Sequence, residues 1–175
     1  ETLSVYSDNV WDLSPYLPKC HCRLNFNSWL EDAREDDFLF CQIRAEMKKI
    51  SFALLYIKSG KSIIKSIEKR HTILRQFAAI AYRNGCTLQQ LFGDVAYMSK
   101  VNDAYISVSY QKALQVKAFL TDCFSIQQQH PWLIPAFSTY QPIEYLAKLA
   151  AQLRLQSGKV GPQTKVVPSR LYIAL

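Results

Sequence analysis

The sequence predicts an all-α protein: a small orthogonal helical bundle of four core helices, with an extended N-terminal arm and a C-terminal helix. Apolar residues recur at helical spacing in several segments, whereas hardly any segment alternates apolar and polar residues as a strand would. Hydrophobic residues make up 49% of the chain and charged residues 20%, which is typical of a folded domain. A chain of 175 residues can build one domain with appendages.

Shifts in composition divide the chain into four parts. Residues 1–35 form an arm and a short helix, 36–130 a helical core, 131–157 a loop and a helix packed on that core, and 158–175 a linker and the start of a following domain. Prolines and aromatic anchors indicate that the arm is extended and held by its rings, which are Tyr6, Trp11, Tyr16 and Phe26. Asn27 or Ser28 is expected to cap the short helix, which contains Trp29 and Leu30.

The first core helix is expected at residues 38–57, directly after a cluster of five carboxylates within residues 31–37. These acids would offset the dipole at the helix N-terminus, and a divalent-metal or catalytic site is the weaker alternative. The helix has an apolar stripe, formed by Phe38, Cys41, Ile43, Met47, Ile50, Leu54 and Ile57. Lys48, Lys49 and Lys58 fall outside this stripe.

The second helix, at residues 61–85, is the most strongly two-sided segment, with Ser62 as its expected N-cap and Asn84-Gly85 as its exit. One face is apolar and comprises Ile63, Ile64, Ile67, His71, Leu74, Phe77, Ala78 and Ala81. The opposite face is cationic and comprises Lys61, Lys65, Lys69, Thr72, Gln76, Ala79 and Arg83. Glu68 is the only acid of the helix and lies beside this face.

Shorter signals place the remaining helices. Thr87 is expected to cap a short helix that turns Leu88, Leu91 and Phe92 inward, and residues 95–99 form another helical piece. Ser107 or Ser109 then caps a helix that runs to about Gln127. One edge of that helix carries Tyr110, Leu114, Lys117 and Thr121. An apolar loop at 132–140, expected to avoid solvent, leads through Pro142 into a last helix at 143–156.

The charge distribution indicates an anionic partner. Net charge is +7, and residues 61–100 hold seven basic and two acidic side chains, whereas residues 1–60 hold seven and nine. A polyanion such as nucleic acid fits this concentration of charge, and a merely solvated basic surface is the alternative. The longest strictly apolar runs, residues 52–57 and 77–82, are far too short to cross a bilayer, so no membrane partner is expected.

The sequence favours a binding module over an enzyme. It contains no nucleotide-binding, nucleophile-elbow or zinc-protease motif, and its three histidines stand apart. Five scattered cysteines indicate a reducing compartment without a disulfide framework. Cys20-His21-Cys22 lacks a second ligand pair at usable spacing. We therefore expect no catalytic residue, no metal and no cofactor in this chain.

The run from Lys48 to Phe124 resembles the N-terminal core-binding, SAM-like domain of tyrosine recombinases, the phage-integrase family. The resemblance is carried by Leu74-Arg75-Gln76-Phe77 within the second helix, by Thr87-Leu88-Gln89-Gln90-Leu91, and by a fourth helix that opens with serine and ends in a phenylalanine-rich stripe. It implies a four-helix module that forms half of a C-shaped clamp on recombination-site DNA. The catalytic domain, with its tyrosine nucleophile, would follow in the chain.

The resemblance implies duplex DNA as partner, possible self-association on DNA, and a bacterial or phage-derived cytoplasmic protein of a mobile element. The expected DNA-binding residues are Lys61, Lys65, Lys69, Thr72, Gln76, Arg83, Ser107, Ser109, Tyr110 and Lys117. Lysines would neutralise phosphates, and Thr72 and Gln76 would reach base edges. The alternative is a helical interaction or dimerisation module of a regulator, with contacts through the Leu114 edge and the 132–137 loop and only non-specific DNA affinity.

Overall fold

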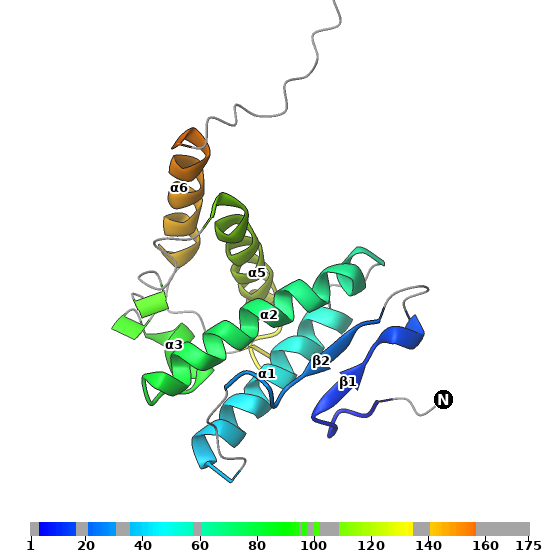
Figure 1. Cartoon of the computed structure of the whole chain (residues 1–175). Coiled ribbons are helices and arrows are strands. Elements are labelled where there is room, and N and C mark those ends of the chain that lie inside the picture. The colour runs from blue at the N-terminus through cyan, green and yellow to red at the C-terminus, as the bar shows by residue number, and fades with distance from the viewer. Residues whose placement is uncertain are drawn as a thin grey trace, which may run out of the picture.

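The computed structural model describes residues 4–16, 21–30, 36–57, 61–94, 96–97, 100–101, 109–134 and 141–156, and it confirms the all-α prediction (Figure 1). The elements, in chain order, are β1 (Val10–Asp12), the 3-10 helix η1 (Ser14–Tyr16), β2 (Arg23–Asn25), α1 (Phe38–Tyr56), α2 (Lys61–Arg83), α3 (Leu88–Gly93), α5 (Tyr110–Gln129) and α6 (Gln141–Gln156). Residues 96–97 and 100–101 are also helical, in and just beyond the short piece expected at 95–99.

Helix α1 begins where a carboxylate caps it. The Asp37 side chain accepts a hydrogen bond from the backbone N–H of Leu39 at 2.8 Å, so this residue of the acidic cluster caps the helix, while 31–35 lie outside the described residues. The expected apolar stripe is wrong at two positions. Phe38 is 81% exposed, because the first turn projects beyond the core. Lys48, expected outside the stripe, is buried because the N-terminal segment covers it.

Helix α2 begins at Lys61, so Ser62 lies inside its first turn and is not the N-cap. Its end confirms the expected exit: Gly85 has φ +65°, a left-handed conformation that glycine adopts without steric cost. The N–H of Cys86 donates to the carbonyl of Ala81 at 3.0 Å, and the N–H of Gly85 donates to that of Tyr82 at 2.9 Å. This pair of bonds is a Schellman motif, which satisfies carbonyls at the helix end.

The caps of α3 and α5 agree with the sequence prediction. Thr87 and Gln90 form a reciprocal capping box, with Thr87 Oγ1 accepting from the Gln90 N–H and Gln90 Oε1 accepting from the Thr87 N–H. Ser109 caps α5 by accepting from the N–H of Lys112 at 3.3 Å. Of the two candidate caps, the structure therefore selects Ser109; Ser107 lies outside the described residues.

The N-terminal arm differs most from the prediction, because it is a hairpin. Strands β1 and β2 pair in antiparallel register, with Trp11 opposite Leu24. Trp11 and Phe26 are buried as anchors, but Tyr6 and Tyr16 are 48% and 57% exposed and do not enter the core.

The short helix expected around Trp29 is absent from residues 26–30, which form bends and a turn. Trp29 stacks instead on Phe40, with ring centroids 4.6 Å apart. Its Nε1 donates to the carbonyl of Phe26 at 2.8 Å.

The helices pack around one hydrophobic core that the hairpin shares. Figure 1 shows α1 and α2 side by side, α5 crossing them, and α6 along α5 on the side away from the hairpin. Phe77 of α2 lies at the centre, 5.7 Å from the Phe92 ring of α3 and 5.6 Å from the Phe119 ring of α5. After α5, Leu133 and Ile134 are buried but Trp132 is 75% exposed, so the expectation that this loop avoids solvent is wrong for Trp132.

Candidate nucleic-acid interface

The outward face of α2 is the candidate interface. Lys69, Thr72, Gln76 and Arg83 are all exposed on it. On the opposite face the described side chains are buried, with Ile67, Leu74, Phe77, Ala78 and Ala81 each 0% exposed. The helix is therefore fixed by its apolar side, and its polar side is presented to solvent along several turns.

Two lysines of the predicted face lie in the first turns of α2. The backbone at Lys61 and Lys65 is helical, and their side chains lie outside the described part of the chain. Helical spacing places both positions on the same face as Lys69 and Arg83.

The cations of this face carry charge that no described neighbour neutralises. Among the described residues, the carboxylate ion pairs are Arg23 with Asp12 and Arg70 with Asp122, and neither involves Lys69 or Arg83. Glu68 is exposed beside Lys69 and is the one acid of α2 that would oppose an anion there. An exposed cation without a partner is available to a phosphate group at little desolvation cost.

Thr72 has a more restricted role than its position suggests. Its hydroxyl donates to the carbonyl of Glu68 in its own helix at 3.0 Å. In this rotamer the oxygen can only accept a further hydrogen bond, so it suits the amino group of a base better than a phosphate oxygen.

Of the residues predicted on the fourth helix, Ser109 is the N-cap of α5, Tyr110 and Lys117 lie within α5, and Ser107 lies outside the described residues. Ser109 uses its hydroxyl as the α5 cap, and Tyr110 and Lys117 are half-buried. Helix α5 contacts α2 at the buried junction of Arg70 and Asp122, which lies on the inner side of α2. The two sets of predicted residues are therefore on different elements, and the continuous exposed row is the one on α2.

Sequence reasoning missed Lys100, which adds a cation near the end of α2. Its Nζ donates to Asn84 Oδ1 at 2.7 Å and lies 5.3 Å from the Tyr97 ring centroid. Asn84 directly follows Arg83, so this exposed lysine stands at the C-terminal end of the cationic face. No local pattern could reveal it, because the contact joins residues 16 positions apart.

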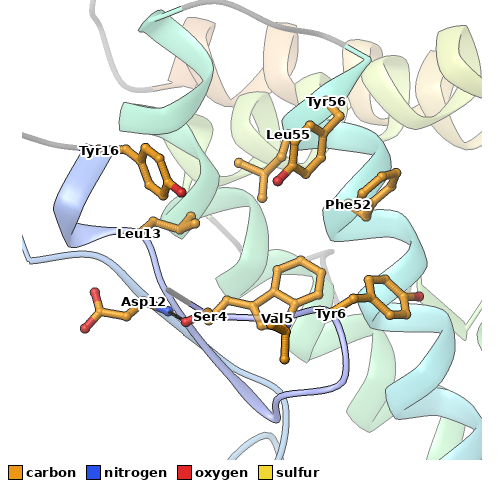
Figure 2. Close-up of a pocket in the computed structure, with 10 residues that line it drawn as sticks. Ser4, Val5, Tyr6, Asp12, Leu13, Tyr16, Phe52, Leu55 and Tyr56 are labelled. Carbon is orange, nitrogen blue, oxygen red and sulfur yellow. Dashed lines mark hydrogen bonds between the residues drawn. The ribbon is translucent and has the colours of Figure 1, made fainter. Parts of the chain in front are cut away.

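A second feature is an aromatic cavity of about 100 Å³ between the N-terminal segment and α1. Figure 2 shows Tyr6, Leu13 and Tyr16 from the N-terminal segment facing Phe52, Leu55 and Tyr56 from α1. The rings of Tyr6, Tyr16 and Tyr56 remain substantially exposed. This surface carries little charge and is distinct from the cationic face of α2.

The described residues hold no group of three or more His, Cys, Asp or Glu side chains that could bind a metal ion. Within the same residues, no helix is both long and apolar enough to cross a membrane. His71 is 5% exposed, and burial lowers its pKa to about 4. His71 is therefore a neutral imidazole at pH 7 that is enclosed in the core.

Comparison with protein families, with curated proteins and with solved structures finds no match for this chain. Fold and surface together define a small helical bundle, completed by an N-terminal hairpin, that presents one cationic helix face.

Proposed function

We propose that this chain is a non-catalytic DNA-binding module that holds duplex DNA against the outward face of α2. The observation that carries the proposal is the exposure of Lys69 and Arg83, without a carboxylate partner among the described residues, on a helix anchored by its buried side. The resemblance of residues 48–124 to the core-binding domain adds the more specific proposal of a site-specific tyrosine recombinase. The clamped DNA would then be a recombination site.

The chemistry of the face supports a phosphate partner. Lysine and arginine bind phosphate oxygens with charge-assisted hydrogen bonds, and each phosphate neutralised releases counterions. Thr72 and Gln76 lie between Lys69 and Arg83 along α2. If the two cations bind phosphates of a duplex, these two polar side chains would face the groove between its strands. Such an arrangement allows cations to position the duplex while the polar side chains face base edges.

Neighbouring residues of opposite charge give a sharp test. Lys69→Gln is expected to weaken duplex binding and to reduce the slope of log K against log salt by about 0.9, the value of one phosphate contact. Glu68→Gln is expected to strengthen binding at low salt by about 0.5 kcal/mol, roughly twofold, because it removes a repelling charge. Fluorescence anisotropy with a labelled short duplex measures both.

Both side chains are exposed, so neither change should alter folding, and thermal melts followed by circular dichroism provide the control. Arg83→Gln is expected to weaken duplex binding and to reduce the salt slope as Lys69→Gln does. If both neutralised cations leave affinity and salt slope at the parent values, the outward face of α2 is not the binding surface.

A protein-interaction module is the second candidate, and exposed apolar side chains favour it. Trp132 is 75% exposed, Leu114 is 38% exposed on α5, and the aromatic cavity lies open beside α1. If Trp132 mediates self-association, Trp132→Ser should shift the sedimentation coefficient toward the monomer value. A parent chain that sediments as a monomer at high concentration would remove this candidate.

A further inference from the structure

Basic side chains of α1 and α2 hold the N-terminal hairpin through neutral oxygen atoms. Arg44 Nη1 donates to Asn27 Oδ1 at 3.0 Å, and Lys48 Nζ donates to the carbonyl of Ser7 at 2.8 Å. Arg75 Nη2 donates to the carbonyl of Ser28. Carbonyl and amide oxygens satisfy the N–H groups without cancelling the positive charge, so these contacts leave the cations electrostatically active.

Arg75 is the one of these three that borders the outward face of α2. It directly precedes the exposed Gln76 and lies one turn beyond Thr72. Its side chain is half-buried, and its hydrogen bond to Ser28 lies at the surface. A guanidinium carries five N–H donors. The Arg75 Nε is buried without a hydrogen-bond partner and Nη2 donates to the carbonyl of Ser28, so Nη1 and the second N–H of Nη2 are the donors that remain for an incoming phosphate.

The carbonyl that Arg75 contacts is held in a fixed place. Next to Ser28, Trp29 is only 6% exposed, stacks on Phe40 of α1 and donates from Nε1 to the carbonyl of Phe26. The N–H of Ser28 itself donates to Asn25 Oδ1 at 3.3 Å. A turn fixed at three points provides a rigid acceptor, which restricts the rotamers of the arginine.

We infer that the hairpin is a positioning element of the nucleic-acid interface: the Ser28 carbonyl orients Arg75 so that its guanidinium binds a phosphate at the edge of the α2 face. The inference rests on the proposed function and extends it, because it makes residues 21–30 part of the DNA-binding unit. The ligand is the phosphodiester backbone of a duplex, selected by the positive charge that the neutral acceptors leave in place.

Salt-dependent binding of a labelled short duplex of arbitrary sequence to the full chain tests this role. Arg75→Gln is expected to lower the slope of log K against log salt by about 0.9. Arg75→Lys keeps the charge but lacks the planar guanidinium that can contact Ser28 and a phosphate together. Its slope of log K against log salt should therefore fall by a similar amount. Arg44→Gln is the matched control, because it removes one cation and one hairpin contact on α1, and its slope should stay at the parent value.

The outcomes separate the two proposals. If Lys69→Gln lowers the slope but Arg75→Gln does not, the role of Arg75 is wrong and the proposed function stands. If Arg75→Lys binds as the parent does, orientation by the hairpin is wrong. If Arg44→Gln and Arg75→Gln lower the slope of log K against log salt equally, the effect comes from the net charge of the protein, and the inference is also overturned. Circular dichroism melts of each variant exclude loss of folding as the cause, and Arg75→Lys retains a cationic donor for Ser28 should Arg75→Gln fail to fold.

Discussion

Replacing Asp122 with alanine is expected to lower the free energy of unfolding by about 3 kcal/mol, because it strands a buried guanidinium. Arg70 Nε donates to Asp122 Oδ2 at 2.9 Å, and its Nη2 contacts the same oxygen. The two side chains are only 19% and 12% exposed, so water cannot replace the lost carboxylate fully. The pair joins α2 to α5, and Arg70 Nη1 also donates to Ser66 Oγ within α2.

Urea unfolding of the parent and the variant measures this effect, and the chain supplies a matched surface pair. Arg23 Nε lies 3.0 Å from Asp12 Oδ2, but the arginine side chain is 70% exposed. Arg23→Ala is therefore expected to cost under about 1 kcal/mol. If Asp122→Ala proves no more harmful than Arg23→Ala, the buried pair does not contribute as argued.

A double variant separates the value of the ion pair from the cost of breaking it. Replacing Arg70 with methionine and Asp122 with leucine removes both charges and keeps apolar volume at the α2–α5 junction. Such replacements of buried ion pairs are commonly neutral, so the double variant should unfold within about 1 kcal/mol of the parent. Stability as low as that of Asp122→Ala would indicate that the pair itself is a net stabilising contact.

Helical periodicity carried most of the fold prediction. The exit of α2 at Gly85, the capping box at Thr87 and the Ser109 cap are local signals in which a few adjacent residues determine the backbone. A serine near the start of a helical pattern was not a sufficient signal by itself, because Ser62, predicted as an N-cap, lies inside the first turn of α2. The buried face of α2 was predicted because its period is sustained over more than five turns.

The N-terminal hairpin could not be predicted in the same way. Each strand has three residues, too few for alternation to be visible. The contacts that hold it are distant in sequence: Lys48 reaches Ser7 across 41 residues and Arg75 reaches Ser28 across 47. A lysine that appeared to belong to the solvent side of α1 was therefore buried by a partner that local patterns do not reveal.

The sequence predicted which residues of α2 point outward, but not the hydrogen bonds and tertiary contacts of the side chains around them. Residue charge and helical periodicity predicted that Lys69, Gln76 and Arg83 point outward, and all three are exposed in the structure. The hydroxyl of Thr72, however, donates within its own helix, which periodicity cannot show. Arg75 and Lys100 lie beside this face and make tertiary contacts with Ser28 and Asn84 respectively, which the local sequence pattern does not reveal.

His71 should make stability depend on pH in a defined window. Its pKa falls from 6.5 to about 4, first because burial disfavours the imidazolium and further because the Arg75 charge is near. Nε2 lies 3.0 Å from the carbonyl of Asn25 and must donate to it, which leaves Nδ1 as the site of protonation. Nδ1 is buried without a partner, and the Phe26 ring lies 5.0 Å away, so an imidazolium there would have no acceptor for its second N–H.

The direction in which the free energy of unfolding changes with pH follows from the protons that each state binds. Between pH 6.5 and about 4 the unfolded chain binds a proton at His71 that the folded chain does not, so acid favours unfolding. This contribution to stability is fully present above pH 6.5 and is lost as the pH falls toward the folded pKa of about 4. The shift from 6.5 to about 4 corresponds to a loss of roughly 3 kcal/mol.

His71→Gln provides the comparison, because glutamine can donate to the Asn25 carbonyl and does not titrate in this range. Urea unfolding at a series of pH values should show the parent losing roughly 3 kcal/mol more than the variant between pH 6.5 and about 4. Asp37, whose carboxylate accepts from the Tyr82 hydroxyl and therefore has a lowered pKa, affects both proteins equally and cancels in the difference. Parallel stability curves for the two proteins would show that the imidazole is protonated in the folded state without cost, and that the hairpin yields to accommodate it.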